Sequence, residues 1–253
     1  MALGANYEAE SPAAAILFSA LDDPFWSLRR YAVNNLSKVA TSTVKEQLKS
    51  KLYTLIISDP VAGVRQAAIK AVLKYFPEGD HSIVLKKAVS DSSYSVSGEA
   101  LSAFTEKNKE EGLLIAKKIE DLSVRTSREQ LFSLYSKYGS DDQFDFMNDA
   151  YARTSGYDRY YSLELYSNYL KRCNTKPALN QGLTTIADQA KSDELWLSRM
   201  AAYKELLVLK KYFTDKENSY ADFNSLKLKA DEYINDIKSS EKDSRVKKSF
   251  DSN

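Results

Sequence analysis

Residues 23–32 read Asp-Pro-Phe-Trp-Ser-Leu-Arg-Arg-Tyr-Ala, and residues 193–202 read Asp-Glu-Leu-Trp-Leu-Ser-Arg-Met-Ala-Ala. Asp, Trp, Arg and Ala coincide at offsets 0, 3, 6 and 9 of these two stretches. A third copy begins at Asp59 and keeps Asp, Arg and Ala, and a weaker copy begins at Asp91 with an aromatic at offset 3 and Ala at offset 9. The sequence therefore contains an internal repeat.

The spacing of these copies gives the length of the repeat. The first and last copies begin 170 residues apart (193 − 23), which is five periods of 34. Two degenerate copies are therefore expected between them, near Asp121 and near Tyr157. Self-similarity with a period of this size is typical of solenoid proteins, in which each supersecondary unit buries its apolar face against its neighbours.

Each shared position of the repeat has a physical explanation. The Asp is expected to accept hydrogen bonds from the free amides of the first helical turn. A Pro at the next position, as at Pro24 and Pro60, has no amide to leave unpaired. Offsets 5, 9 and 13 fall on one apolar helical face. In the first copy these offsets are Leu28, Ala32 and Leu36. An amphipathic segment precedes each copy, so the unit is predicted to be helix, short turn and Asp-led helix.

The repeat predicts an all-α fold, a right-handed α-α superhelix of about six helical hairpins of the HEAT or armadillo kind. The repeat domain is expected over residues 11–213, followed by a linker and a capping helix over residues 214–238. Residues 1–10 and residues 239–253 are expected to be disordered, and the latter segment is charged, rich in serine and poor in apolar residues.

The composition argues against several classes of protein. Lys plus Arg number 36 and Asp plus Glu number 35, a balance that is atypical of a general nucleic-acid binder. One His and one Cys exclude most zinc sites and an internal disulfide framework, so no cofactor is expected in this chain. No apolar stretch approaches the ~18 residues of a membrane span, and the N-terminus lacks the features of a signal peptide. We expect a soluble chain without membrane contacts, and its compartment stays open.

Recurrent arginines and tryptophans are candidate contact residues. Arg29, Arg65 and Arg199 share offset 6. They either bond the capping Asp of an adjacent unit, which we favour, or form a row of cations on a concave wall. Trp26 and Trp196 share offset 3 and either fill the core between helices, which we favour, or anchor a partner.

Tyrosine is abundant, with 17 residues, and six of them lie within residues 151–169. Tyr157, Tyr160 and Tyr161 begin a predicted second helix, on the face that usually lines the inner curve of such solenoids. Packing between hairpins is the favoured interpretation. The alternative is a contact surface for a peptide or a neighbouring domain.

The remaining motifs predict no catalytic, cofactor-binding or metal-binding residue. His81 is expected to be solvated at the start of a helix, and Cys173 is expected to be a packed, inert thiol. Gly-x-Ser-x-Gly and phosphate-binding Gly-rich motifs are absent. Basic pairs such as Lys86–Lys87 alternate with acidic residues, which indicates solvated helix faces rather than a nucleic-acid-binding stripe.

The run Ala20-Leu-Asp-Asp-Pro-Phe-Trp-Ser-Leu-Arg-Arg-Tyr-Ala-Val-Asn-Asn-Leu36 resembles the C-terminal helical region of bacterial zinc aminopeptidases of the alanyl/leucyl (gluzincin) type. The likeness continues through Asp59–Phe76 and Asp193–Phe213. In that family the zinc and the exopeptidase glutamates lie in an earlier domain, which this sequence lacks. The resemblance implies a non-catalytic domain that caps the active-site cavity and shapes peptide access. Its implied partners are the catalytic domain of the parent chain and peptide substrate.

Two alternatives stay open. The chain is either this aminopeptidase domain or a free-standing HEAT-repeat scaffold that binds proteins. A helical-repeat DNA-binding protein is the less favoured third hypothesis.

Overall fold

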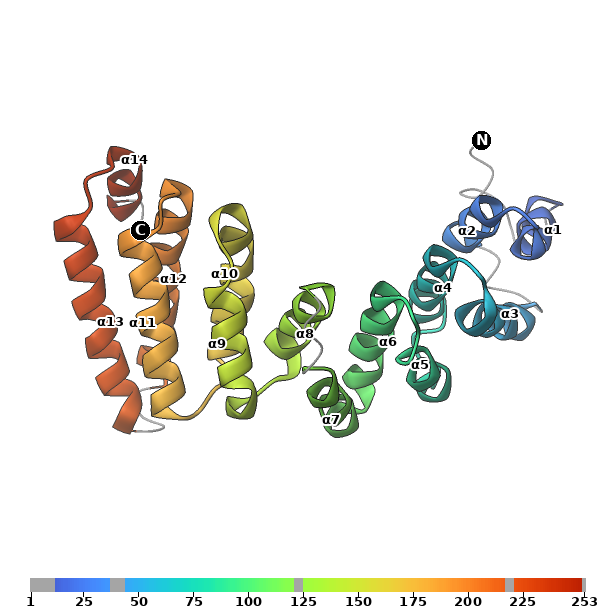
Figure 1. The fold of residues 1–253 in the computed structure, drawn as a ribbon, viewed down its shortest axis with the longest axis horizontal. Helices are drawn as coiled ribbons and strands as arrows, with labels where there is room; N and C mark the ends of the chain where they lie inside the picture. The colour runs from blue at the N-terminus through green and yellow to red at the C-terminus, as the bar shows by residue number, and fades with distance from the viewer. Residues whose placement is uncertain (1–11, 37–43, 121–124, 217–220, 252–253) are drawn as a thin grey trace. The chain divides into compact units, whose positions relative to one another are not determined.

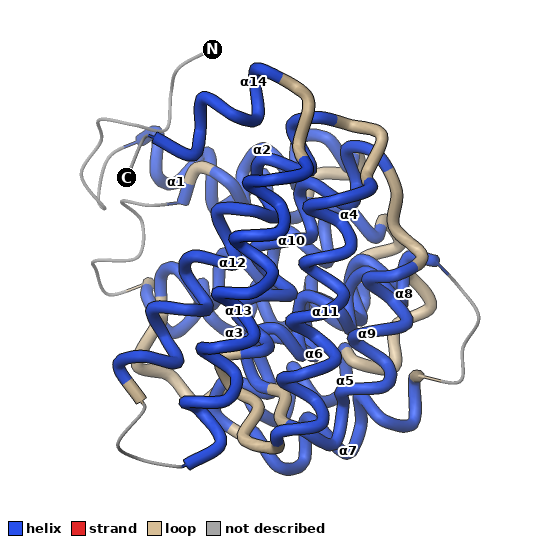
Figure 2. Tube along the Cα trace, turned by 90° about the vertical axis from the view of Figure 1, so that its left-hand side faces the viewer, coloured by secondary structure: helices blue, strands red, loops and turns tan. Residues whose placement is uncertain are grey.

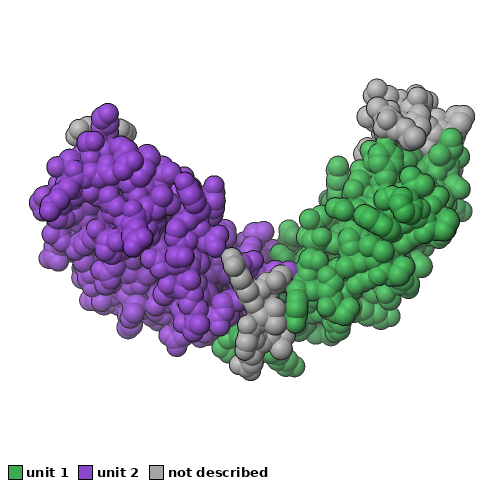
Figure 3. Space-filling view, turned by 45° about the horizontal axis from the view of Figure 1, so that its top comes forward, with its two compact units in different colours: residues 1–127 green, residues 128–253 purple. Residues whose placement is uncertain are grey.

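A computed structural model describes residues 12–36, 44–120, 125–216 and 221–251. Every regular element in these ranges is a helix, which confirms the all-α prediction (Figures 1 and 2). The chain divides into two compact units, residues 1–127 and residues 128–253 (Figure 3), so the repeat region predicted over 11–213 falls in both. The HEAT or armadillo type and the handedness stay predictions.

Unit 1 consists of helices arranged in two layers. They are α1 (Pro12–Ser19), the 3-10 helix η1 (Ala20–Asp22), α2 (Trp26–Asn34), α3 (Lys45–Ser58), α4 (Ala62–Tyr75), α5 (Ser82–Ala88), α6 (Tyr94–Lys107) and α7 (Lys109–Ile119). The second helices of the hairpins pack in sequence, α2 on α4 and α4 on α6, and the first helices α3 and α5 pack in the other layer. This is the arrangement that the repeat predicts.

Unit 2 continues the alternation of first and second helices. Its elements are α8 (Arg125–Tyr138), whose first three residues fall in unit 1, η3 (Asp141–Gln143), α9 (Phe144–Ala152), α10 (Gly156–Leu170), α11 (Lys176–Ser192), α12 (Trp196–Asp215), α13 (Ala221–Ser240), α14 (Ser244–Lys247) and η4 (Lys248–Asp251). α12 packs against α10, α11 and α13, and α11 packs against α9 and α13. The core of this unit therefore lies around α11 and α12.

The repeat Asp residues lie further ahead of their helices than the capping position that the sequence predicts. The helices begin three residues after the Asp, because the residue just before each helix has an extended backbone, as at Phe25 (φ −88°, ψ 115°). The Asp is therefore not the capping residue. Its Oδ1 instead accepts the N–H two residues ahead. These bonds are Phe25 N to Asp23 (2.7 Å), Val61 N to Asp59 (2.8 Å), Ser93 N to Asp91 (2.7 Å) and Leu195 N to Asp193 (2.9 Å).

The apolar face predicted at offsets 5, 9 and 13 is buried, with one exception. Ala32, Val64 and Val96 are fully buried, whereas Leu28 is 45% exposed. Leu28 lies on α2, the first second-layer helix among the described residues of unit 1. Among the described residues, no second-layer helix precedes α2, so α2 lacks the neighbour that α4 has in α2.

The expectation of a disordered C-terminal tail is wrong for residues 239–251. α13 extends to Ser240, and α14 and η4 follow it. Val246 is fully buried, and the ring of Phe250 lies 4.5 Å from that of Tyr203 on α12. Val246 and Phe250 are therefore apolar anchors of this otherwise polar segment. The disorder expected for residues 1–10 lies outside the described residues.

Candidate functional site

The offset-6 arginines of unit 1 bond the Asp of the following repeat. Arg29 donates from Nε and Nη2 to Asp59 at 2.6 and 3.0 Å, and Arg65 donates likewise to Asp91 at 2.6 and 2.7 Å. Bonds of this kind raise the pKa of both guanidinium groups, although burial opposes the shift. Arg29 and Arg65 are largely buried and occupied. The bonding that the ladder interpretation predicts is therefore confirmed for both arginines.

Arg199 keeps the geometry but pairs with a different residue type. Its Nη1 donates to the backbone oxygen of Asp193 at 2.7 Å, as Arg29 does to Asp23. Its Nε donates to Glu241 at 2.9 Å. The acidic partner thus comes from the C-terminal segment that the sequence indicated to be disordered, so Arg199 is a structural residue as well.

Two further arginines share this helical position without having been predicted; Arg159 pairs with a repeat Asp, Asp193, whereas the partner of Arg128, Asp149, lies within α9. Arg128 and Arg159 are the fourth residues of α8 and α10, the position that Arg29 holds in α2. Arg128 Nη1 lies 2.8 Å from Asp149 Oδ2, and Arg159 Nη1 lies 3.7 Å from Asp193 Oδ2. Both arginines share their place in the helix with Arg29, but neither follows an Asp by six residues.

The two tryptophans differ in their surroundings. Trp26 is 42% exposed beside Phe25, which is 59% exposed, so the core interpretation is wrong for Trp26. Trp196 is partly buried, and the guanidinium carbon of Arg245 lies 4.6 Å from the centre of its ring. The C-terminal segment therefore covers part of the Trp196 ring.

Tyr157, Tyr160 and Tyr161 form a cluster at the start of α10, which we call the tyrosine cluster; Tyr160 is half-buried. The rings of Tyr157 and Tyr161 are stacked with centroids 6.5 Å apart, and the ring of Tyr160 meets that of Tyr161 edge-on at 5.2 Å. Tyr157 is 58% and Tyr161 is 70% exposed, so packing between hairpins is wrong for these two. Residues four apart share a helix face, and this one points away from the core.

The other tyrosines of this region are buried in the core of unit 2. Tyr151 stacks on Tyr166 with centroids 4.4 Å apart, and the Tyr166 hydroxyl donates to Asn148 at 2.6 Å. The Tyr169 hydroxyl donates to the backbone oxygen of Ser140 at 2.6 Å. Burial raises the pKa of all three phenols. For these residues the packing interpretation is confirmed.

Cys173 is fully buried, and burial raises the pKa of its thiol to about 11. Because the thiolate is the reactive form, we expect the native protein to react negligibly with a disulfide reagent such as DTNB at pH 8. Addition of urea should then release one thiol equivalent. Complete reaction of the native protein within minutes would contradict the buried placement, and as the sequence has one Cys, the signal has one source.

His81 is buried rather than solvated as predicted, with 3% exposure. Its Nε2 lies 2.8 Å from the carbonyl oxygen of Phe76, which can only accept, so Nε2 carries the proton. The Tyr53 hydroxyl then donates to Nδ1 at 2.6 Å. Tyr53 comes from α3, which explains why the local sequence did not show this burial.

The contacts of the C-terminal segment predict a response to acid. Hydrogen bonds from the Arg245 side chain and N–H lower the pKa of Asp243 to about 2. Burial opposes the shift at Glu241, but bonds from Arg199 and the Asp243 N–H lower the pKa of that carboxyl as well. These folded-state pKa values lie below the unfolded values of about 4. The stabilisation is therefore complete above pH ~4 and is lost as the pH falls toward ~2.

We expect this loss to change the fluorescence of Trp196, over which Arg245 lies. In a Trp26→Phe background, the emission should shift between pH ~4 and ~2 before the helical circular dichroism signal falls. Emission that follows the helical signal at every pH would show that the segment is not a separately titrating element.

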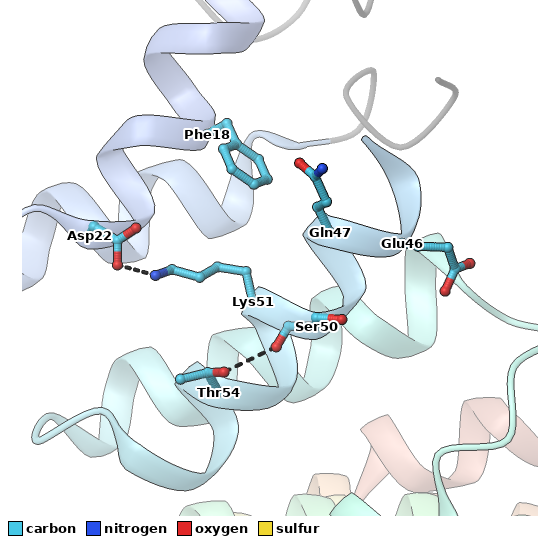
Figure 4. A pocket seen from close by; sticks show the side chains of 7 residues that line it. All are labelled: Phe18, Asp22, Glu46, Gln47, Ser50, Lys51 and Thr54. Carbon is cyan, nitrogen blue, oxygen red and sulfur yellow. Dashed lines mark hydrogen bonds and ion pairs between the residues drawn. The ribbon is translucent and has the colours of Figure 1, made fainter. Parts of the chain in front are cut away.

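Two open cavities lie on the first-helix layer of unit 1. One, of ≈ 510 Å³, is lined by Phe18, Asp22 and residues of α3, and the ion pair of Lys51 with Asp22 lies across it (Figure 4). The other, of ≈ 440 Å³, lies beside Tyr53 and His81. Among the residues that the structure describes, no three His, Cys, Asp or Glu side chains converge to hold a metal ion.

Several of the basic pairs are neutralised by neighbouring acids. Lys86 lies 2.5 Å from Glu111, Lys117 lies 2.5 Å from Glu120, and Lys210 lies 2.5 Å from Asp231. These contacts agree with solvated helix faces. Over the described ranges, none of the helices is long and apolar enough to span a bilayer.

Comparison with known proteins adds no assignment. No protein-family model matches the sequence, and no curated protein matches it significantly.

Proposed function

We propose that this chain is a non-catalytic helical-repeat module that binds a protein segment through the tyrosine cluster. The observation that carries the proposal is the exposure of Tyr157 and Tyr161 on α10, a helix on which Tyr160 is half-buried and Tyr166 and Tyr169 are buried. Tyrosine provides a large contact area at a low cost in conformational entropy. Grouped aromatic residues commonly dominate the binding energy of an interface.

The framework around the cluster favours recognition without rearrangement. Arg159 of α10 donates to the backbone oxygen of Ala152 at 2.9 Å and pairs with Asp193, so both ends of the α9–α10 turn are tied. The buried stack of Tyr151 and Tyr166 supports the same helix from below. A rigid helix that presents aromatic side chains loses little freedom on binding.

The resemblance to zinc aminopeptidases implies a specific partner for the module. In that form of the proposal the partner is the catalytic domain of the same polypeptide, whose active-site cavity the module caps, and zinc belongs to that domain. In the alternative form the module is a free-standing scaffold, and its partner is a separate protein. Neither form assigns catalysis to this chain or binding to nucleic acid or membrane.

The test is capture of a partner by the full chain and by the Tyr157→Ala/Tyr161→Ala variant. Tyr94→Ala is the matched control, since Tyr94 is 41% exposed but lies on α6 of unit 1. A stoichiometric partner should be retained by the control and lost at least tenfold by the double variant. Equal capture by all three proteins would overturn the role of the cluster.

A second observation separates the two forms of the proposal. An upstream coding sequence with His-Glu-x-x-His would support the aminopeptidase form, and a separate captured protein would support the scaffold form. Hydrolysis of aminoacyl substrates by the purified chain would overturn the non-catalytic assignment. Salt-dependent retention on heparin would favour the nucleic-acid alternative instead.

A further inference from the structure

Glu164 lies on the same face of α10 as the exposed tyrosines of the tyrosine cluster. It follows Tyr161 by three residues and Tyr157 by seven, so at 3.6 residues per turn these three side chains fall within about 60° of the helix circumference. All three are exposed. The aromatic surface therefore has a carboxylate beside it, and we call Tyr157, Tyr161 and Glu164 the α10 stripe.

The exposed charge of α10 is negative. Asp158 and Glu164 are the acidic residues of this helix, and both are exposed. Arg159 is its one basic residue, and the guanidinium is directed to the backbone oxygen of Ala152 and to Asp193. Among the residues that the structure describes, none forms a hydrogen bond or an ion pair with the Glu164 carboxylate. This carboxylate is thus available to a cation of a partner.

Elsewhere in unit 2, cations lie over half-buried aromatic rings. A cation within about 6 Å of a ring centre is attracted by the negative face of the ring. These contacts are Arg245 over Trp196 (4.6 Å), Lys216 over Tyr212 (5.2 Å), and Lys191 and Lys229 over Tyr233 (5.2 and 5.5 Å). In the described part of the chain, no Lys or Arg lies over a ring of the tyrosine cluster. The cluster and Glu164 therefore present an aromatic face and a negative charge together, without a cation of their own.

An arginine side chain is complementary to both features of the α10 stripe. Its planar guanidinium stacks on an aromatic face, and its fork of N–H donors fits a carboxylate with two parallel bonds. Side chains three residues apart on a helix have Cβ atoms about 5–6 Å apart, so one guanidinium can contact the ring of Tyr161 and the carboxylate of Glu164 together. A lysine ammonium lacks the planar surface, and an acidic or phosphorylated segment would be repelled by Asp158 and Glu164.

We propose that the α10 stripe binds an arginine side chain in a short extended segment of the partner protein. The guanidinium stacks on the rings of Tyr157 and Tyr161 and donates to Glu164. The stripe is about 10 Å long, which is the span of three residues of extended chain. This site rests on the proposed function, because it specifies the chemistry of the segment that the tyrosine cluster binds.

Four immobilised peptide pools serve as the probe. They are biotinylated heptapeptides Ala-X-X-Z-X-X-Ala, in which X is any residue except Cys and Z is Arg, Lys, Glu or Leu. Retention of the full chain is measured at about 50 mM NaCl, where screening of exposed charges is weak. The Arg pool should retain about fivefold more protein than the Glu or Leu pool, and the Lys pool should retain an intermediate amount.

Matched variants assign this retention to the α10 stripe. Tyr157→Ala/Tyr161→Ala and Glu164→Gln should each remove most of the preference for the Arg pool, and Glu164→Arg should transfer the preference to the Glu pool. Glu232→Gln is the control and should keep the Arg preference, because Glu232 is an exposed carboxylate of the same unit on α13. The helical circular dichroism signal should be the same in all variants, since the replaced side chains are exposed.

The outcomes separate this site from the proposed function. Equal retention on the four pools, an Arg preference that persists in Glu164→Gln, or a preference of the unchanged chain for the Glu pool would each overturn arginine recognition. A stoichiometric protein that is lost by Tyr157→Ala/Tyr161→Ala but kept by Glu164→Gln would also overturn it and would leave the proposed function intact. Equal capture of that protein by the full chain and by the double tyrosine variant would instead overturn the proposed function.

Discussion

Replacing Arg29 by alanine should lower the free energy of unfolding of unit 1 by about 3–5 kcal/mol. The side chain of Asp59 is 1% exposed, and both of its oxygens accept from Arg29. The variant would leave this carboxylate buried without its counter-charge, and the desolvation cost of an unpaired buried charge is large. Arg29 also donates to the backbone oxygens of Asp23 and Pro24, so the turn before α2 would lose two further bonds.

The measurement is urea unfolding followed by fluorescence. The sequence has two tryptophans, and a Trp196→Phe background leaves Trp26 as the reporter of unit 1. Arg30→Ala is the control, because the adjacent Arg30 is exposed, and its removal should change the stability by no more than about 0.5 kcal/mol. A cost below ~1 kcal/mol for Arg29→Ala would show that the pair behaves as a solvated surface ion pair.

The repeat made much of the fold predictable. Asp, Arg and Ala recur at fixed offsets, so the helical hairpins and the pairing of Arg29 and Arg65 followed from spacing alone. The same search missed Arg159 because Arg153, not Asp, lies three residues before α10. In this repeat the Asp position has changed, whereas the arginine at offset 6 is retained.

The features that could not be predicted from the sequence depend on contacts between segments that are distant along the chain. His81 has the local sequence of a helix start, and its burial comes from Tyr53, 28 residues earlier. The C-terminal segment is polar by composition, yet Val246 is buried, and Glu241 pairs with Arg199 from 42 residues away. Exposure of Tyr157 and Tyr161 depends on the rotation of α10, which a cluster of six tyrosines leaves ambiguous.

Replacing Tyr151 by alanine should lower the free energy of unfolding of unit 2 by about 3–5 kcal/mol, the range for removal of a buried aromatic ring. Tyr151 is 1% exposed and lies between Tyr166, at 4.4 Å, and Phe132, at 6.5 Å, in a near-parallel stack. The cavity would open between three helices, α8, α9 and α10. Unfolding in urea, followed by Trp196 in a Trp26→Phe background, measures the loss.

Tyr151→Phe separates the ring from its hydroxyl. The hydroxyl bonds the side-chain oxygen of Gln189, which is 3% exposed, so the variant should cost about 1–3 kcal/mol while it keeps the stack. Tyr161→Ala is the matched control on the same tyrosine-rich segment, and as Tyr161 is 70% exposed, the stability should change by no more than about 0.5 kcal/mol. Equal losses for Tyr151→Ala and Tyr161→Ala would contradict the division of these tyrosines into a buried stack and an exposed cluster. A neutral Tyr161→Ala, by contrast, makes any loss of binding in that variant a loss of contact rather than of folding.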